Sequence, residues 1–300
     1  MHNINDKKVK RIVTHSGNFH ADEVFACAVL SILNDDNVEI MRSRDPEVWA
    51  TGDYVVDVGG VYDHTAGRYD HHQAGGAGTH ENGIPYSSLG LVWKHYGALV
   101  TGSPEAALVI TRRLVEPIDA VDNGIETFAV TGVAAPYLIQ DAVVMFRPGW
   151  NEARTEDEGF FEAFDMAKKI LKREIILAQG KTEGEARARN AYNTAEDKRI
   201  IVLDGNYPWF EAFAGQPEPI FVVRPEREGD GQWKVGTVRA EAHTFKNRKD
   251  LPVAWAGKQG KELAEISGVP DATFCHNKLF VAGAGSREGA IALAKKALEA

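Results

Sequence analysis

The sequence predicts an α/β protein built from two domains. Short runs rich in β-branched residues alternate with stretches in which apolar residues recur at helical spacing, first at "KRIVTH" (10–15) and "HADEVFACAVLSIL" (20–33). A long, charged stretch of helical period at 156–197 interrupts this alternation. The alternation resumes at "KRIIVLDG" (198–205) and continues to the end of the chain. Two α/β regions joined by helix account for all three observations.

The first region starts with a strand, a helix and two further strands. We predict strands at 10–15, at "VEIMRSR" (38–44), which alternates apolar and polar residues, and at "YVVDVGG" (54–60), which ends in glycines. The helix at 20–33 lies between the first two strands. This β-α-β-β order predicts a mostly parallel sheet with helices on both faces. Helices are also expected further along, at 87–97 and at 105–123, with a break or bend at Pro117.

The second region has strand patterns at 198–205, 219–226 and 232–240. The turn "REGDGQ" (227–232) joins the last two as a hairpin. The chain closes with a strand, a glycine turn and a helix in "KLFVAGAGSREGAIALAKKALEA". The expected division of the chain is a first domain at 1–145, a helical connector at 146–197 and a smaller α/β C-terminal domain at 198–300.

Composition excludes several classes of protein. No stretch approaches the roughly 20 apolar residues that span a bilayer, and no apolar signal core precedes the first strand, so we expect no membrane span and no export. Cys27 and Cys275 stand alone, which fits a reducing compartment, and we expect a cytoplasmic protein. The formal net charge of -9 argues against general coating of nucleic acid, but a local basic groove is compatible with it.

Histidines and aspartates gather where the predicted strands of the first region end. In an open α/β sheet, the loops at the carboxyl ends of the strands converge on one crevice, so we expect these side chains to share one space. "RYDHHQ" (68–73) places three of them side by side. The full set is His15, His20, Asp22, Asp57, Asp70, His71, His72, Asp119 and Asp122.

Such a set is typical of a site for two divalent cations. Mixed histidine and carboxylate ligands favour Mn²⁺ over Mg²⁺, Zn²⁺ or Fe²⁺. We expect Asp57 to bridge the two ions, because the end of a strand is rigid and central. Single residues also have structural explanations: His20 and Asp22 could cap a helix, and Asp122 before Asn-Gly could serve a turn. Caps and turns explain the whole set poorly.

These motifs resemble a known group of enzymes. "H-x4-H-x-D", "VVDVGG", "YDHHQ" and "DAVDNG" together are similar to the DHH phosphoesterase superfamily. The closer resemblance is to the melanocyte-proliferating-gene protein family, a DHH-like 3'-5' RNA exonuclease branch. The stretches "RAEAHTFKNRKDLPVAWAGKQGKELAEISGV" and "FCHNKLFVAGAGSREGAIALAKKAL" resemble its second domain, so the likeness runs from about Lys10 to Leu298.

The resemblance implies a role for each residue of the first domain. His72 would face the substrate phosphate, Asp70 would orient His71, and Asp119 competes with Asp122 as a ligand. The chain departs from the superfamily at His20, where a carboxylate is usual, and this shifts the metal preference toward Zn²⁺, Fe²⁺ or Ni²⁺. The implied ligands are His15, His20, Asp22, Asp57 as the bridge, His71 and Asp122.

In the second domain, the glycine turn that opens the last helix is a candidate phosphate cradle. Backbone N–H groups at a helix N-terminus bind anions, and an arginine there could pair with a phosphate. The chain lacks the Gly-Gly-Gly-His element of the superfamily at this place. The glycines could also serve the turn alone, His276 could be a core residue, and Trp209 and Phe210 are better explained by packing than by base stacking. The substrate candidates are His276, Gly283, Gly285, Ser286 and Arg287.

The function that these observations predict is a dinuclear metal-dependent phosphodiesterase. The resemblance implies 3'-5' exonuclease action on single-stranded RNA or short oligonucleotides, with no membrane partner; the oligomeric state stays open, with a homodimer as one option. The first alternative is a hydrolase of pyrophosphate or a cyclic dinucleotide. The second is a non-catalytic, metal-stabilised binding protein. An oxidoreductase built on "GAGSREG" is disfavoured, because the chain ends before the acidic ribose contact expected ~20 residues on.

Overall fold

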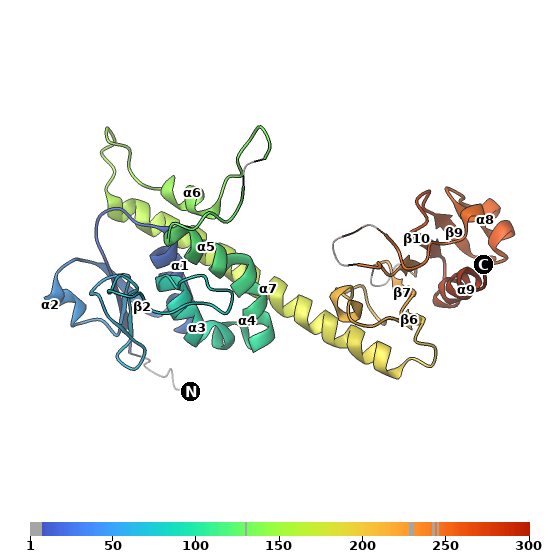
Figure 1. The fold of residues 1–300 in the computed structure, drawn as a ribbon, viewed down its shortest axis with the longest axis horizontal. Coiled ribbons are helices and arrows are strands. Elements are labelled where there is room, and N and C mark those ends of the chain that lie inside the picture. Colours follow the sequence, from blue (N-terminus) through green and yellow to red (C-terminus); the bar gives the residue numbers. More distant parts are fainter. Residues whose placement is uncertain (1–7, 130, 228–230, 242–243, 245) are drawn as a thin grey trace, which may run out of the picture. The chain divides into compact units, whose positions relative to one another are not determined.

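The structure is a computed structural model that describes residues 8–129, 131–227, 231–241, 244 and 246–300. The chain divides into two compact units, Met1–Gln179 and Gly180–Ala300 (Figure 1). Each unit contains a five-stranded sheet with helices packed against it, so the predicted α/β class is confirmed.

The sheet of the first unit is mostly parallel, as predicted. Its strand order is β2-β1-β3-β5-β4, and only β4 runs antiparallel to its neighbour. β4 and β5 were not expected, because strands of two residues leave no periodic pattern in the sequence. The strands are β1 (Lys10–Thr14), β2 (Val38–Arg42), β3 (Tyr54–Val56), β4 (Tyr62–Asp63) and β5 (Arg68–Tyr69).

One face of this sheet holds the main core. The helix α1 (Ala21–Leu33) is buried along almost its whole length, where it packs against α3 (Ser88–Thr101) and the sheet. On the other face, the short helix α2 (Pro46–Trp49) covers a smaller cluster around Val13 and Val55. Helices on both faces are therefore present, but they differ in extent.

The predicted helix at 105–123 is continuous but changes its winding. It consists of α4 (Pro104–Ile110), a π-helical turn at Thr111–Val115 and α5 (Glu116–Asp122). In the wide turn, the Glu116 N–H bonds the Thr111 carbonyl five residues earlier. This winding accommodates Pro117, which lacks an N–H and would crowd the preceding turn of an ordinary α-helix.

The charged stretch at 156–197 contains one helix, α7 (Glu156–Thr194), where several were expected. Phe160, Ala163 and Leu171 enter the core of the first unit, and Ala188 enters a core of the second. The division between the units falls inside this helix. A further short helix, α6 (Ile139–Val144), precedes it.

The second unit has a mixed sheet with strand order β6-β7-β8-β10-β9. Only β6 and β7 run parallel. The helix α9 (Arg287–Glu299) covers one face. The predicted hairpin turn at 227–232 lies partly outside the described residues. The strands are β6 (Ile200–Val202), β7 (Phe221–Pro225), β8 (Trp233–Thr237), β9 (Ala272–Cys275) and β10 (Val281–Ala284), and α8 (Gly260–Ser267) and 3-10 turns at Glu211–Phe213 and Val253–Trp255 complete the unit.

Within the described part of the chain, no helix combines the length and the apolar character needed to cross a membrane.

Candidate metal centre

The predicted metal ligands lie where three neighbouring parallel strands of the first unit end. β1, β3 and β5 are adjacent in the sheet, and His15, Asp57 and the segment 70–72 follow them directly. His20 is the N-cap of α1, and Asp122 is the last residue of α5. The fold therefore brings together segments that are separated by more than a hundred positions in the sequence.

Eight side chains form one connected group, which we call the strand-end cluster. Their ligand-type atoms make four overlapping sets, and within each set the atoms lie within 4.8 Å of one another. Four residues each belong to two sets and so link the cluster: His20, Asp22, Glu23 and Asp57. The members are His15, His20, Asp22, Glu23, Asp57, His71, His72 and Asp122.

Asp57 is central to this cluster and has an unusual backbone. Its φ is 57°, in the left-handed region that non-glycine residues seldom adopt. Its side chain is buried between two histidines: Oδ2 lies 3.2 Å from His15 Nε2, and Oδ1 lies 3.4 Å from His71 Nε2. Backbone strain of this kind is commonly kept at functional sites, where the surrounding structure holds it.

Several buried polar atoms of the cluster have no hydrogen-bond partner among the described residues. They are Asp22 Oδ1, Asp57 Oδ1 and His71 Nε2. Buried polar atoms are nearly always paired, so each such atom needs an explanation. His71 Nε2 is also 3.2 Å from Asp122 Oδ2, yet these neighbours do not align as hydrogen bonds. Unpaired donor atoms of carboxylate and imidazole, gathered in one place, fit a divalent cation.

The charges in the cluster also favour a bound cation. Burial, together with the carboxylates of Asp22 and Asp57, raises the pKa of Asp122 to about 9. Burial also raises the pKa of Glu23 to about 8, although contact with His15 opposes it. Carboxylates this close repel one another, and a cation would relieve the repulsion.

The histidines of the cluster partly balance these acids. Burial disfavours charge on His15, but contacts with Asp57 and Glu23 outweigh it and raise the pKa of His15 to about 10. In the same way, Asp57 outweighs burial and raises the pKa of His71 to about 9. Without a metal, protonated imidazoles therefore supply positive charge to the cluster, and a bound metal would displace their protons.

The sequence analysis missed Glu23. This residue is fully buried, and its carboxylate accepts two hydrogen bonds from the His20 N–H, at 2.8 and 2.9 Å. Its Oε1 lies 3.1 Å from His15 Nε2. The sequence did carry a signal: a glutamate three residues after a helix start is half of a capping box, and here it holds His20 and His15 in place.

The structure separates the two candidates at the end of α5. Asp119 is fully buried, and its carboxylate accepts from Ser87 Oγ at 2.5 Å, from the Gly90 N–H at 3.0 Å and contacts His80 Nε2 at 2.6 Å. Its oxygens are thus occupied within the protein. Asp122, one turn on, is the one that joins the strand-end cluster.

Asp70 contacts a different histidine from the one expected. Its Oδ1 lies 2.8 Å from His72 Nδ1, and its Oδ2 accepts from the Gly60 N–H at 2.5 Å. The expectation that Asp70 orients His71 is therefore corrected to His72. Because a carboxylate can only accept, it holds the proton on Nδ1 and leaves Nε2 of His72 for another partner.

Two cavities border the strand-end cluster. One, of about 360 Å³, is lined by His71, Asp122 and Gln140 among others. The other, of about 640 Å³, is lined by His15, Arg44 and Asp70 among others. His20, Asp57 and His72 line both, and the His72 side chain is 62% exposed. A ligand can therefore approach the cluster from solvent past His72.

The substrate candidates of the second unit do not come together. His276 follows β9 at one end of the β9-β10 hairpin, where its N–H bonds the Val281 carbonyl. Gly285 lies at the other end, where its N–H bonds the Asp271 carbonyl. In β10, Gly283 lies beneath the ring of Phe274.

The expected phosphate cradle at the start of α9 is filled by the protein itself. Ser286 caps the helix by accepting from the Gly289 N–H at 3.0 Å, and its hydroxyl donates to Asp271 Oδ2 at 2.5 Å. A carboxylate therefore stands where an anion would bind, and it would repel a phosphate. Arg287, the expected phosphate partner, forms an ion pair at 3.9 Å with Glu288.

Comparison with known proteins shows similarity over nearly the whole chain. The family model MYG1_exonuc, described as "Uncharacterised protein family (UPF0160)", matches residues 11–298. The chain is 34% identical over 324 residues to the MYG1 exonuclease of Mus musculus, covering 96% of this chain and 84% of that protein. For the MYG1 exonuclease of Homo sapiens the identity is also 34%, with coverage of 96% and 85%. The MYG1 protein of Dictyostelium discoideum is 34% identical over 318 residues, covering 96% of both chains. No solved structure matches the chain.

Proposed function

The chain belongs to the MYG1_exonuc family, and on that premise we propose that it is a metal-dependent hydrolase of phosphodiester bonds with a DHH-like catalytic centre. The mouse and human relatives carry the name exonuclease. We extend that activity to this chain, as 3'-5' cleavage of single-stranded RNA or short oligonucleotides.

The observation that carries the proposal is the set of unpaired buried atoms in the strand-end cluster. Asp22 Oδ1, Asp57 Oδ1 and His71 Nε2 come from three separate segments and lie without hydrogen-bond partners among the described residues. A cluster kept only for stability would pair these atoms, because each unpaired buried group costs about 1–3 kcal/mol. Asp57 Oδ1 and His71 Nε2 lie 3.4 Å apart without an aligned hydrogen bond, and Asp22 Oδ1 has none either, which supports a ligand that the three atoms bind together.

In this proposal the cluster holds two divalent cations, with Mn²⁺ as the first choice. Asp57 is the proposed bridge, since its two carboxylate oxygens each face a different histidine of the ligand set, His15 and His71. Two such ions would supply Lewis-acid activation of water and charge neutralisation at the phosphoryl group. The ligands that we assign are His15, His20, Asp22, Asp57, His71 and Asp122, with Glu23 positioning His15 and His20.

His72 is the residue proposed to act on the substrate. It is the most exposed histidine of its set and lies between the two cavities. Asp70 fixes the ring through Nδ1 at 2.8 Å, so Nε2 is the atom that would donate to a phosphoryl oxygen or carry a proton to the leaving group. Asp70 is thus a positioning residue for His72.

The test is cleavage of a single-stranded RNA labelled at its 5' end. Metal-stripped protein is reloaded with Mn²⁺, and an Asp57→Ala variant and a parallel pyrophosphate assay are run beside it. A ladder of shortened labelled products, absent with the variant, is expected, because trimming from the 3' end leaves the label on the shortened chain.

Other results would change the proposal. Phosphate release from pyrophosphate without RNA cleavage would move the substrate to small phosphoanhydrides. Metal bound at the cluster with neither substrate cleaved, in Mn²⁺, Mg²⁺ or Zn²⁺, would contradict the catalytic proposal and leave a structural site.

A further inference from the structure

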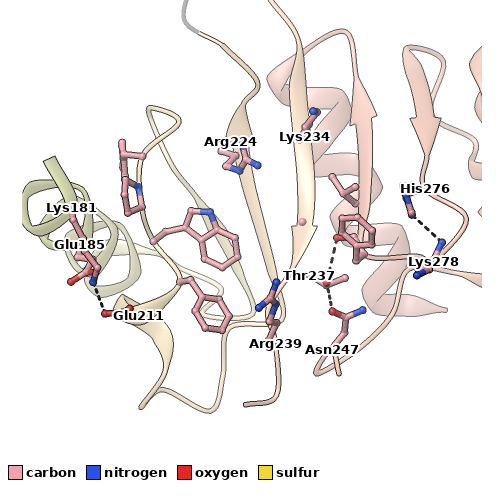
Figure 2. Close-up of a pocket in the computed structure, with 17 residues that line it drawn as sticks. Lys181, Glu185, Glu211, Arg224, Lys234, Thr237, Arg239, Asn247, His276 and Lys278 are labelled. Carbon is pink, nitrogen blue, oxygen red and sulfur yellow. Dashed lines mark hydrogen bonds and ion pairs between the residues drawn. The ribbon is translucent and has the colours of Figure 1, made fainter. Parts of the chain in front are cut away.

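A second, chemically different cavity lies within the second unit. It has a volume of about 930 Å³ and is formed over one face of the sheet, between α7 and the loop after β9 (Figure 2). Strand alternation identifies the face: Val235 points into the core beneath α9, so Lys234 and Gly236, its neighbours in β8, point the other way. The size suits a small organic ligand, for which pockets of about 300–1,000 Å³ are usual.

A glycine forms part of the floor of this cavity. Gly236 lies in the central strand β8, and a Cβ placed on it would meet no atom within 4 Å. Glycine weakens a strand, because it packs no side chain and costs more conformational entropy. A central-strand glycine that opens space which the protein leaves unfilled is typical of a place where a ligand comes close to the backbone.

The walls carry an excess of positive charge in a chain whose formal net charge is -9. Lys181 pairs with Glu185 and Glu211, which are the acidic residues of the lining, on the α7 side of the cavity (Figure 2). The remaining charged side chains that line the cavity are cationic, and they lie on the side away from α7 in the same view. They are Arg224, Lys234, Arg239 and Lys278, with His276 beside the last.

Two of these cations lack a carboxylate partner in the described part of the chain. Arg224 is half-buried and donates to Asn206 Oδ1 at 2.7 Å, and burial lowers its pKa. Lys278 is exposed, and no ion pair holds its ammonium group. A guanidinium held partly away from water without a carboxylate is well placed to bind an anion.

Aromatic side chains lie among the cations. Trp209 packs partly against Phe213, with ring centroids 5.9 Å apart, and the indole also lines the cavity. Phe280 lines it with an exposed side chain, 42% accessible, and its ring lies 4.4 Å from that of His276. Trp209, which we expected to serve packing, thus both packs against Phe213 and faces the cavity.

We propose that this cavity binds a nucleotide unit, with the base against the aromatic side chains above Gly236 and the phosphate on Arg224 and Lys278. The proposal rests on the proposed function, because it names the place where a nucleotide substrate or product is held in the second unit. Stacking on aromatic rings combined with a cationic wall is how single-stranded nucleic acid is bound without base reading. An apolar ligand would leave the cations unused, and a bare phosphate would leave the rings unused.

The test fills the floor of the cavity and measures binding by calorimetry. Gly236→Val places a side chain where the backbone leaves room, and a β-branched residue favours a strand, so the thermal unfolding midpoint should hold or rise. Gly215→Val is the matched control, since Gly215 also has no atom within 4 Å of a Cβ and lies outside the cavity. The probes are AMP, a phosphorothioate pentanucleotide that resists cleavage, and inorganic phosphate.

We expect wild type and Gly215→Val to bind AMP and the pentanucleotide equally, and Gly236→Val to bind both about tenfold more weakly or worse. Tighter binding of the pentanucleotide than of AMP would identify the end of a strand as the natural ligand, and equal binding would identify a free nucleotide. A second pair, Lys278→Ala and Phe280→Ala, changes exposed side chains and should each weaken binding several-fold. These variants keep the test valid if Gly236→Val does not fold.

Two results would overturn the proposal: unchanged nucleotide binding in Gly236→Val, or phosphate binding as tightly as AMP. Failure of the proposed function looks different. Nucleotide binding that responds to Gly236→Val, with no RNA cleavage by the wild type in any metal, would leave this site standing and remove the activity. RNA cleavage by the wild type, together with nucleotide binding that is unchanged in Gly236→Val, would support the activity and remove this nucleotide site.

Discussion

The strand-end cluster and the cavity of the second unit differ in both burial and charge. The cluster packs carboxylates and imidazoles out of water, and its acids raise one another's pKa, as at Asp122. The cavity presents cations to solvent around a glycine floor. A buried site in which carboxylates repel one another favours a bound cation, whereas an open basic site attracts an anion. This contrast is compatible with the proposed phosphodiesterase, in which one unit would bind metal and the other a phosphate.

The largest effect that tests this contrast is loss of the central carboxylate. Asp57→Ala removes the buried carboxylate that faces both His15 and His71, so we expect RNA cleavage to fall by about a thousandfold or more. Initial rates in Mn²⁺ and metal content by mass spectrometry measure it. Asp63→Asn, an exposed aspartate of the same unit, is the control and should keep both. Nucleotide binding in the second unit should be unchanged in both variants; parallel loss of binding and cleavage in Asp57→Ala would contradict two independent sites.

The second prediction separates the two aspartates of α5. Asp119→Ala leaves His80, Ser87 and the Gly90 N–H without their acceptor in a buried place, so the free energy of unfolding should fall by about 3 kcal/mol. Asp122→Ala removes one of the mutually repelling carboxylates, so the metal-free protein should keep its stability while metal affinity falls. Urea unfolding and metal titration measure the two effects. Equal stability losses in both variants would show that Asp122 is structural as well.

The sequence predicted the cluster far better than the cavity, for a physical reason. His15 and Asp57 each follow a strand that can be recognised locally, and His71 belongs to the "YDHHQ" motif. The ends of parallel strands lie at one edge of the sheet, which brings these residues together. The cavity instead depends on the register between distant strands: Gly236 faces it because β8 pairs with β7 and β10 in one particular alignment. A one-residue slip would turn Gly236 inward, and no local pattern specifies that register.

The errors have the same origin. The glycine turn before α9 has the composition of an anion cradle, but Asp271 is brought there only by the β9-β10 pairing. Asp70 precedes both histidines, and only the folded loop directs it to His72. Glu23 was missed because a capping glutamate looks like a surface residue until α1 is found buried. The π-helical turn that accommodates Pro117 likewise has no sequence signature of its own.

The third prediction is that removal of the metal destabilises the first unit and leaves the second unit unchanged. A ligand present at about a hundredfold excess over its dissociation constant stabilises the state that binds it by about 2.7 kcal/mol. Removing the metal with a chelator should therefore raise hydrogen exchange in α1, which carries Asp22, and in β3, which Asp57 follows directly. The strands β8 and β10 serve as the internal control and should exchange as before. A uniform rise in both units would argue that the metal stabilises the whole chain, and no rise at all would argue against a bound metal.

The smallest effect, and the most direct comparison of the two sites, is their response to salt. Binding of the pentanucleotide phosphates to cationic side chains releases counterions. Its affinity should therefore fall about seven- to twentyfold when salt rises from ~50 to ~200 mM, as expected for two or three contacts with a single strand. Charges buried in the strand-end cluster are screened much less, so at saturating Mn²⁺ the exchange protection of α1 should hardly change. Calorimetry and hydrogen exchange on one sample series measure both. If the nucleotide affinity did not depend on the salt concentration, Arg224 and Lys278 would not hold the phosphate. The aromatic side chains would then account for the binding alone.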